Sequence, residues 1–286
     1  MAGRLAALEA ELKAKPRRPP SAAMGVAPAP AVSAPPPWVP WRMPTAFGGT
    51  LTFGVEGGVI TDPFYRNPDE KKRVSGRGGG RTMHLGIDVS LSNASGGGAD
   101  DTRRGLPVFV SLKPSIDVDG LNAVAVMRER EAGPGETGLA IPGSGAATLE
   151  DARVHRQPWE QPGDAYGGVV GLSARYSYVK TDGSPGTVVL YVEWLHLITE
   201  RFLPQDGTGR VMSRAEWDAT GKGIGFGPEM QAGRVLTTAE LTQDPPLLIG
   251  HVGATKFPHT HIQAALAGSQ AQAPSRPRFD PTVVVA

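Results

Sequence analysis

Short runs of β-branched, aromatic and small residues, separated by glycine- and proline-rich turns, most restrict the fold of this 286-residue chain. The runs are GTLTFGV, Met83–Leu91, LPVFVSL, GVVGLSARYSYV, TVVLYVEWLHLI, PPLLIGHVG and HTHIQAAL. Several alternate apolar with polar or small residues, as strands with one buried face do. No helix-length periodic segment separates them, which disfavours βαβ units. The pattern therefore predicts a mainly β protein built on an antiparallel sheet.

The N-terminal region has a different composition from the rest of the chain. Residues 1–15 carry three leucines at helical spacing among charges, which predicts a short amphipathic helix, either a frayed end or a docking or sorting tag. Residues 16–44 are rich in proline and alanine and suit an extended linker. We therefore place the folded domain at residues 45–286.

Three stretches of that domain have the glycine-rich and polar composition of long loop insertions, namely residues 92–104, 114–165 and 204–227. The third contains SRAEWDATGKG, in which Ser213 followed by Glu216 has the spacing of a capping box, so a short helix is expected there. Loops of this length over a sheet could form the walls of a groove.

Composition excludes several classes of function. The chain has no cysteine, so disulfides, thiolate metal sites and cysteine nucleophiles are absent. Its net charge of +1 provides no strong field toward nucleic acid or an anionic membrane. No stretch approaches the roughly 18 apolar residues of a membrane span. A basic cluster over residues 71–81 is interpreted either as a solvated loop or as a positively charged rim that attracts acidic cell-wall polymers.

Two short motifs place metal-binding side chains on common faces. In MHLGIDVSL, an extended chain directs His84, Gly86 and Asp88 to one side and the aliphatic residues to the other. In PHTHIQAAL, His259 and His261 share a face, so one imidazole could bind a metal while the other lies beside its water. Catalytic zinc sites commonly use three nitrogen or oxygen ligands, and His84, Asp88 and His261 can supply them.

A further histidine, His196, lies at the end of the run TVVLYVEWLHL, whose composition predicts a central buried strand. The end of such a strand can present a functional side chain at the rim of a groove. A histidine that only fills the core is the competing interpretation. His259 could likewise be structural.

The order of these motifs resembles that of lysostaphin/LytM-type zinc peptidases. The segment VITDPFYRNPDEKKRVSGRGGGRTMHLGIDVS is similar to the opening block of that family, which ends in His-x-Gly-x-Asp. LYVEWLHL, LLIGHVGAT and PHTHIQAAL resemble its Tyr-x-His-Leu strand, its Ile-Gly-x-x-Gly-x-Thr turn and its His-Leu-His-Phe block. The likeness extends in pieces from about residue 50 to residue 281.

The resemblance implies a zinc-dependent endopeptidase acting on peptidoglycan stem or cross-bridge peptides. His84, Asp88 and His261 would bind Zn²⁺, and His196 and His259 would be the catalytic histidines. The chain departs from the family in two ways. The two metal-binding motifs are far apart in the sequence, and the family's Tyr-x-His-Leu block is replaced by Glu-Trp-Leu-His at residues 193–196. These departures bear on the groove and the substrate, and they remove no ligand.

The remaining histidines and one glutamate are left out of the predicted site. His155 lies in a polar, proline-bearing stretch and is expected to be an exposed bystander, and His251 is expected to be structural in its turn. Glu193 is not a zincin base because His-Glu-x-x-His is absent.

Two wider expectations concern how the chain is used. The alternative to an enzyme is a non-catalytic wall-binding, regulatory or particle-associated module of the same fold. The N-terminus lacks the apolar core of a secretory signal. A protein made in the cytoplasm would then act on the wall after lysis, injection or particle-borne delivery, with residues 1–40 docking to a carrier.

Overall fold

The computed structural model describes one of two compact units into which the chain divides, Met1–Trp38 and Val39–Ala286. The described residues, all in the second unit, are 51–56, 58–62, 64, 84–90, 104–124, 126, 138–156, 167–206, 208–255, 258–266 and 278–286. The predicted helix at 1–15, the linker at 16–44, the basic cluster at 71–81 and all but the last residue of the insertion at 92–104 lie outside them. No described helix has the length and apolar character needed to cross a membrane.

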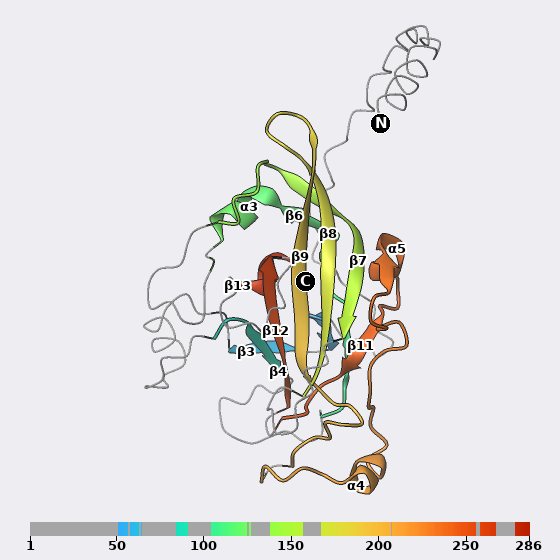
Figure 1. Ribbon diagram of the computed structural model, residues 1–286. Coiled ribbons are helices and arrows are strands. Elements are labelled where there is room, and N and C mark those ends of the chain that lie inside the picture. The colour runs from blue at the N-terminus through green and yellow to red at the C-terminus, as the bar shows by residue number, and fades with distance from the viewer. Residues whose placement is uncertain are drawn as a thin grey trace, which may run out of the picture. The chain divides into compact units, whose positions relative to one another are not determined.

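A large antiparallel sheet dominates the described part of the chain (Figure 1). Its strands, in spatial order, are β10 (Val235–Thr237), β7 (Ala146–Arg156), β8 (Gly168–Val179), β9 (Pro185–Leu197), β12 (His259–Leu266), β4 (Ile87–Ser90) and β3 (Val59–Asp62). β13 (Arg278–Phe279) also pairs with β12, and β6 (Ser115–Asp117) pairs with β7. The prediction of a mainly antiparallel β protein is confirmed.

A smaller sheet of β1 (Leu51–Thr52), β2 (Val55–Glu56), β5 (Pro107–Phe109) and β11 (Leu248–His251) covers one face of the large sheet. Val108 and Ile249 of the small sheet share one buried cluster with Leu172 and Trp194 of the large one. The run GTLTFGV was predicted as one strand, but its described part forms a tight hairpin with Glu56, because Phe53 and Gly54 adopt positive φ and reverse the chain between β1 and β2.

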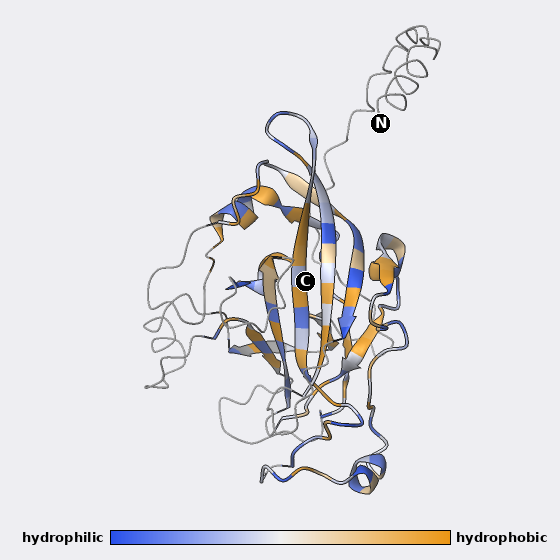
Figure 2. Cartoon of the chain, in the orientation of Figure 1, coloured by the Kyte–Doolittle hydropathy of each residue, from blue (hydrophilic) through white to orange (hydrophobic). Residues whose placement is uncertain are grey.

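The three long strands β7, β8 and β9 direct alternate side chains to the two faces of the large sheet. Figure 2 shows hydrophobic and hydrophilic residues alternating along them. In β9, Leu190, Val192 and Trp194 enter the shared core, whereas Tyr191 and Glu193 point to the opposite face. That opposite face carries the histidine motifs.

The expected loop insertion at residues 114–165 requires correction. It contains β6, the helix α3 (Val118–Ala123) and the eleven-residue strand β7, whose Leu149 and Val154 belong to the core. A register shift between residues 149 and 151 interrupts the two-residue period of β7. Because of this bulge, buried and exposed residues do not alternate regularly along β7, and the sequence pattern alone does not reveal the strand.

The stretch at 204–227 has no described strand longer than an isolated bridge and contains the predicted helix, α4 (Arg214–Asp218). Ser213 caps it and Glu216 completes the capping box, as the spacing predicts. Trp217 of α4 is 1% exposed and packs with Ile198 and Ala254 in a small separate core. The stretch is thereby anchored beside the end of β9. The remaining helices among the described residues are α5 (Thr238–Leu241) and η2 (Pro281–Val283).

Candidate metal centre

The pairing of β4 with β12 brings the two histidine motifs together. The strands are antiparallel neighbours, and His261 lies directly opposite Asp88, 173 residues away in the chain. On the underside of the first motif, Leu85, Ile87 and Val89 are 3%, 1% and 0% exposed, as the predicted alternation requires. The apolar underside fixes β4 against the core and leaves its polar side chains on the open face.

Three donor atoms converge above these strands. His84 Nε2 lies 3.2 Å from Asp88 Oδ1 and 3.1 Å from His261 Nδ1, and His261 Nδ1 lies 2.8 Å from Asp88 Oδ1. Zinc bonds of about 2.0–2.1 Å imply tetrahedral ligand separations of about 3.3 Å. The triangle therefore has nearly the dimensions of one face of a metal tetrahedron. His84, Asp88 and His261 form a group that could hold a metal ion.

The protonation of the group also suits metal binding, which needs an ionised carboxylate and neutral imidazoles. Burial alone would raise the pKa of Asp88, but hydrogen bonds with His261 and His84 and the nearby histidine charges hold it well below its usual range. Burial lowers the pKa of His261 and outweighs the opposing effect of Asp88. Both side chains are thus biased toward the forms that bind a cation.

Asp62 is an outer partner of the group that the sequence reasoning missed. Its Oδ2 lies 4.0 Å from His84 Nδ1, the ring nitrogen that faces away from the donor triangle. A register shift between Ile60 and Asp62 places Asp62 opposite Asp88. A carboxylate behind a ligating imidazole favours the orientation in which the other nitrogen faces the metal. The sequence offered one signal for Asp62, namely its position in the VITDPF segment of the family-like opening block.

Gly86 leaves room for His261. A Cβ at this position would lie 2.4 Å from His261 Nε2 and 2.5 Å from the carbonyl oxygen of Ile262. The ring and the neighbouring strand therefore occupy the space that any side chain would need. The glycine in His-x-Gly-x-Asp thus permits the close approach of β12 to β4.

We expect Gly86→Ala to weaken metal affinity about 10- to 100-fold, the range seen when the surroundings that orient a ligand are disturbed. Titration against a chromophoric chelator measures this. Gly145→Ala is the matched control, because Gly145 has a φ of +79° but open space around its Cβ position. It should lower stability without changing metal affinity. Equal affinity of the Gly86 variant and the parent would contradict the steric account.

Two more imidazoles adjoin the donor triangle. The ring of His259 lies 4.5 Å from that of His196, and His259 Nε2 lies 3.8 Å from Asp88 Oδ1. The ring of His196 is 6.1 Å from that of His261. The structure therefore brings together all five residues singled out from the sequence, from β4 with the residues before it, β9 and β12.

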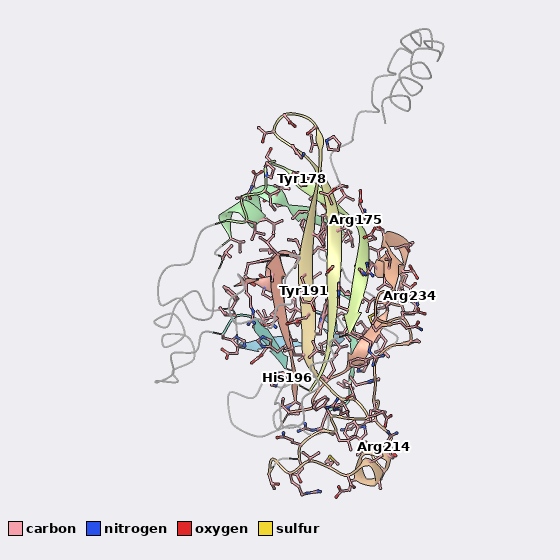
Figure 3. All side chains as sticks on the ribbon, in the orientation of Figure 1. Arg175, Tyr178, Tyr191, His196, Arg214 and Arg234 are labelled. Atoms are coloured by element: carbon pink, nitrogen blue, oxygen red, sulfur yellow. The ribbon has the colours of Figure 1, made fainter. Side chains whose placement is uncertain are left out.

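His196 reaches this position through an unusual backbone conformation. Its φ is +64°, and Phe53 and Ala140 are the other non-glycine residues with positive φ among those described. Figure 3 shows His196 at the end of β9, where that strand leaves its pairing with β12. Positive φ is costly for a residue with a Cβ and recurs at functional sites. It favours a positioned side chain over a histidine that merely fills the core.

The other histidines lie elsewhere. His155 was expected to be an exposed bystander in a loop, but it lies in β7, half-buried, with Nε2 2.8 Å from Ser173 Oγ and its ring against Tyr191. His251 holds a structural position, since its Nδ1 bonds the carbonyl oxygen of Gly225 at 3.0 Å. Neither contributes to the donor triangle.

Glu193 is buried on the same face and lies outside the donor group. It is fully covered, and its carboxylate accepts a hydrogen bond from Gln263 on β12. Burial raises its pKa to about 7, against the lowering effects of Gln263 and Arg278. The buried pair joins β9 to β12 next to the histidine motifs.

Comparison of the chain with models of protein families, with curated proteins and with solved structures returns no match in any of the three.

Proposed function

We propose that this protein is a zinc-dependent endopeptidase of the lysostaphin/LytM type that hydrolyses peptide bonds of bacterial peptidoglycan. The observation that carries the proposal is the convergence of five side chains: three donors at metal-ligand separation, and two further imidazoles beside them. Metal-dependent hydrolysis needs three protein ligands, an open coordination position and groups that handle a proton.

Zinc is the proposed ion because the donors are two imidazole nitrogens and one carboxylate oxygen. This set also suits Fe²⁺ in oxygenases, in which the same ligand types leave several positions open. The two additional histidines favour zinc, since hydrolysis requires proton transfer and oxyanion stabilisation, which imidazoles perform near neutral pH. When bound, Zn²⁺ supplies Lewis acidity, which lowers the pKa of water and polarises a carbonyl.

The protein side chains would divide the remaining work of amide hydrolysis. His84, Asp88 and His261 would hold the ion, and Asp62 would orient the ring of His84. His259, with Nε2 directed toward Asp88, can accept a proton from the attacking water and deliver it to the leaving amine. From the adjacent position, His196 can donate a hydrogen bond to the developing oxyanion.

The substrate class rests on the resemblance in motif order. A peptide in an extended conformation suits the open face of a sheet, and the anchored stretch at 204–227 lies beside the end of β9. We propose stem or cross-bridge peptides of peptidoglycan on the strength of the family-like blocks around His84, His196 and His259.

The proposal is tested by digesting purified peptidoglycan with the full chain, with and without a chelator, and by mass analysis of the muropeptides. We expect cleaved peptide cross-links or stems, loss of cleavage on chelation, and recovery when zinc is returned. Metal content should be about one zinc per chain, as in mononuclear catalytic sites.

The outcomes separate the alternatives. Bound zinc with intact muropeptides would replace the enzyme with a non-catalytic wall-binding or regulatory module. Bound iron would exclude the proposed zinc enzyme. Cleavage that survives complete removal of metal would contradict the mechanism.

A further inference from the structure

The turn between β11 and β12 touches both histidines that flank the metal group. The amides of Gly253 and Ala254 donate to the carbonyl oxygen of His196 at 3.1 and 2.9 Å. Two donors on one carbonyl hold the peptide unit that follows His196, the residue with φ of +64°. This local backbone conformation is unfavourable, so surrounding contacts must select it.

The same turn continues to the second histidine. Thr255 Oγ1 lies 3.3 Å from Nδ1 of His259, and Nε2 of that ring faces Asp88 at 3.8 Å. The hydroxyl contacts the nitrogen on the outer side of the imidazole, and the opposite nitrogen points into the candidate site. A hydrogen bond on the outer nitrogen fixes both the tautomer and the orientation of a histidine ring.

Arg104 anchors the turn at residues 253–255 through its guanidinium group. Its side chain is 2% exposed, and its Nη1 donates to the carbonyl oxygens of Gly253 and Thr255, each at 2.5 Å. The next residue, Gly105, donates its amide to Val252 at 2.8 Å. Charge-assisted hydrogen bonds in a buried setting are stronger than neutral ones. The guanidinium thus immobilises the two ends of a three-residue segment.

Gly253 permits this close approach. It has a φ of +106°, and a Cβ there would lie 2.9 Å from Cγ of Arg104. The turn therefore packs directly against the aliphatic part of the Arg104 side chain. Its carbonyl groups face Arg104, and this orientation directs the amides of Gly253 and Ala254 toward His196. One buried side chain is linked through three consecutive residues to both imidazoles.

We propose that Arg104 and Thr255 are positioning residues of the enzyme: Arg104 anchors the turn at 253–255, and the turn sets the orientations of His196 and His259. This inference rests on the proposed function for its effect on catalysis. The anchoring itself is a property of the fold. Neither residue belongs to the donor triangle, so metal binding is expected to be independent of both.

The kinetic test uses the full chain loaded with zinc and a purified cross-linked muropeptide as substrate. We expect Thr255→Val and Arg104→Met to lower kcat about 10- to 100-fold, the usual cost of losing an outer partner. KM, zinc stoichiometry and the absorption spectrum of the cobalt-substituted protein should stay as in the parent. Thr255→Ser, which keeps the hydroxyl, should restore kcat.

Arg104→Lys should restore part of the activity, because a single nitrogen of Arg104 makes both carbonyl contacts and an ammonium can do the same. Thr181→Val is the matched control, an exposed threonine at the tip of the β8–β9 hairpin, and it should behave as the parent. Parental kcat in Thr255→Val, or failure of serine to rescue it, would overturn the role of Thr255.

Amide hydrogen exchange tests the anchor without any assay of hydrolysis. The amides of Gly253 and Ala254 should be protected in the parent and in Thr255→Val, and should exchange at least about tenfold faster in Arg104→Met, given the strength of charged hydrogen bonds. Unchanged protection in Arg104→Met would overturn the anchor even if the protein hydrolyses nothing. Faster exchange with parental kcat would overturn the link to catalysis. Absence of hydrolysis in the parent would instead reject the proposed function.

Discussion

Replacing His261 with alanine should remove bound zinc and reduce hydrolysis of cell-wall suspensions to the background of the assay. His261 supplies one corner of the donor triangle, 2.8 Å from Asp88 Oδ1 and 3.1 Å from His84 Nε2. Two remaining ligands are fewer than the three that mononuclear catalytic sites use. Metal analysis after gel filtration, together with turbidity clearing, measures both effects.

The control for this variant is His155→Ala, which removes a half-buried imidazole outside the donor triangle. It should retain zinc and activity. Circular dichroism should show that both variants keep the β structure of the parent, since His261 projects from the open face of β12. If His261→Ala clears cell walls as fast as the parent, the metal mechanism is wrong.

Replacing His259 with alanine should lower kcat by about 10²- to 10⁴-fold, the range associated with a general acid or base. Replacing His196 should lower it by about 10²- to 10³-fold, the cost of losing one oxyanion donor. Zinc content should remain at the parental level, because neither imidazole belongs to the donor triangle. The pair of variants thus separates the handling of protons from the binding of metal. Kinetics on a purified muropeptide, with zinc content measured on the same samples, provides the comparison.

The double variant sharpens the same test. The two rings are 4.5 Å apart, but the proposal gives them different tasks, since His259 moves a proton and His196 donates to the oxyanion. We therefore expect the separate losses of His196→Ala and His259→Ala to multiply approximately in the double variant. A double variant little worse than the poorer single one would show that the two imidazoles act as one unit and would contradict this division of roles. Parental kcat in both single variants would show that the imidazoles beside the metal group serve structure alone.

The strands that alternate cleanly were predicted well from the sequence. β8 and β12 occupy the expected stretches 168–179 and 259–266. β7 was missed because its bulge breaks the alternation between Leu149 and Asp151 and because a glycine-rich stretch precedes it. β3, β6, β10 and β13 have two to four residues each, too few to show a period. Such short strands are formed by the neighbours they pair with.

The sequence by itself determined the kinds of donor, their local spacing and the faces they share, because extended backbone places alternate residues on the same side. Tertiary structure alone decided that His261 lies opposite Asp88, that His196 turns toward His259 through a positive φ, and that Asp62, Thr255 and Arg104 support the site. These contacts join segments far apart in the chain. Their register follows from packing of the common core, which no local pattern encodes.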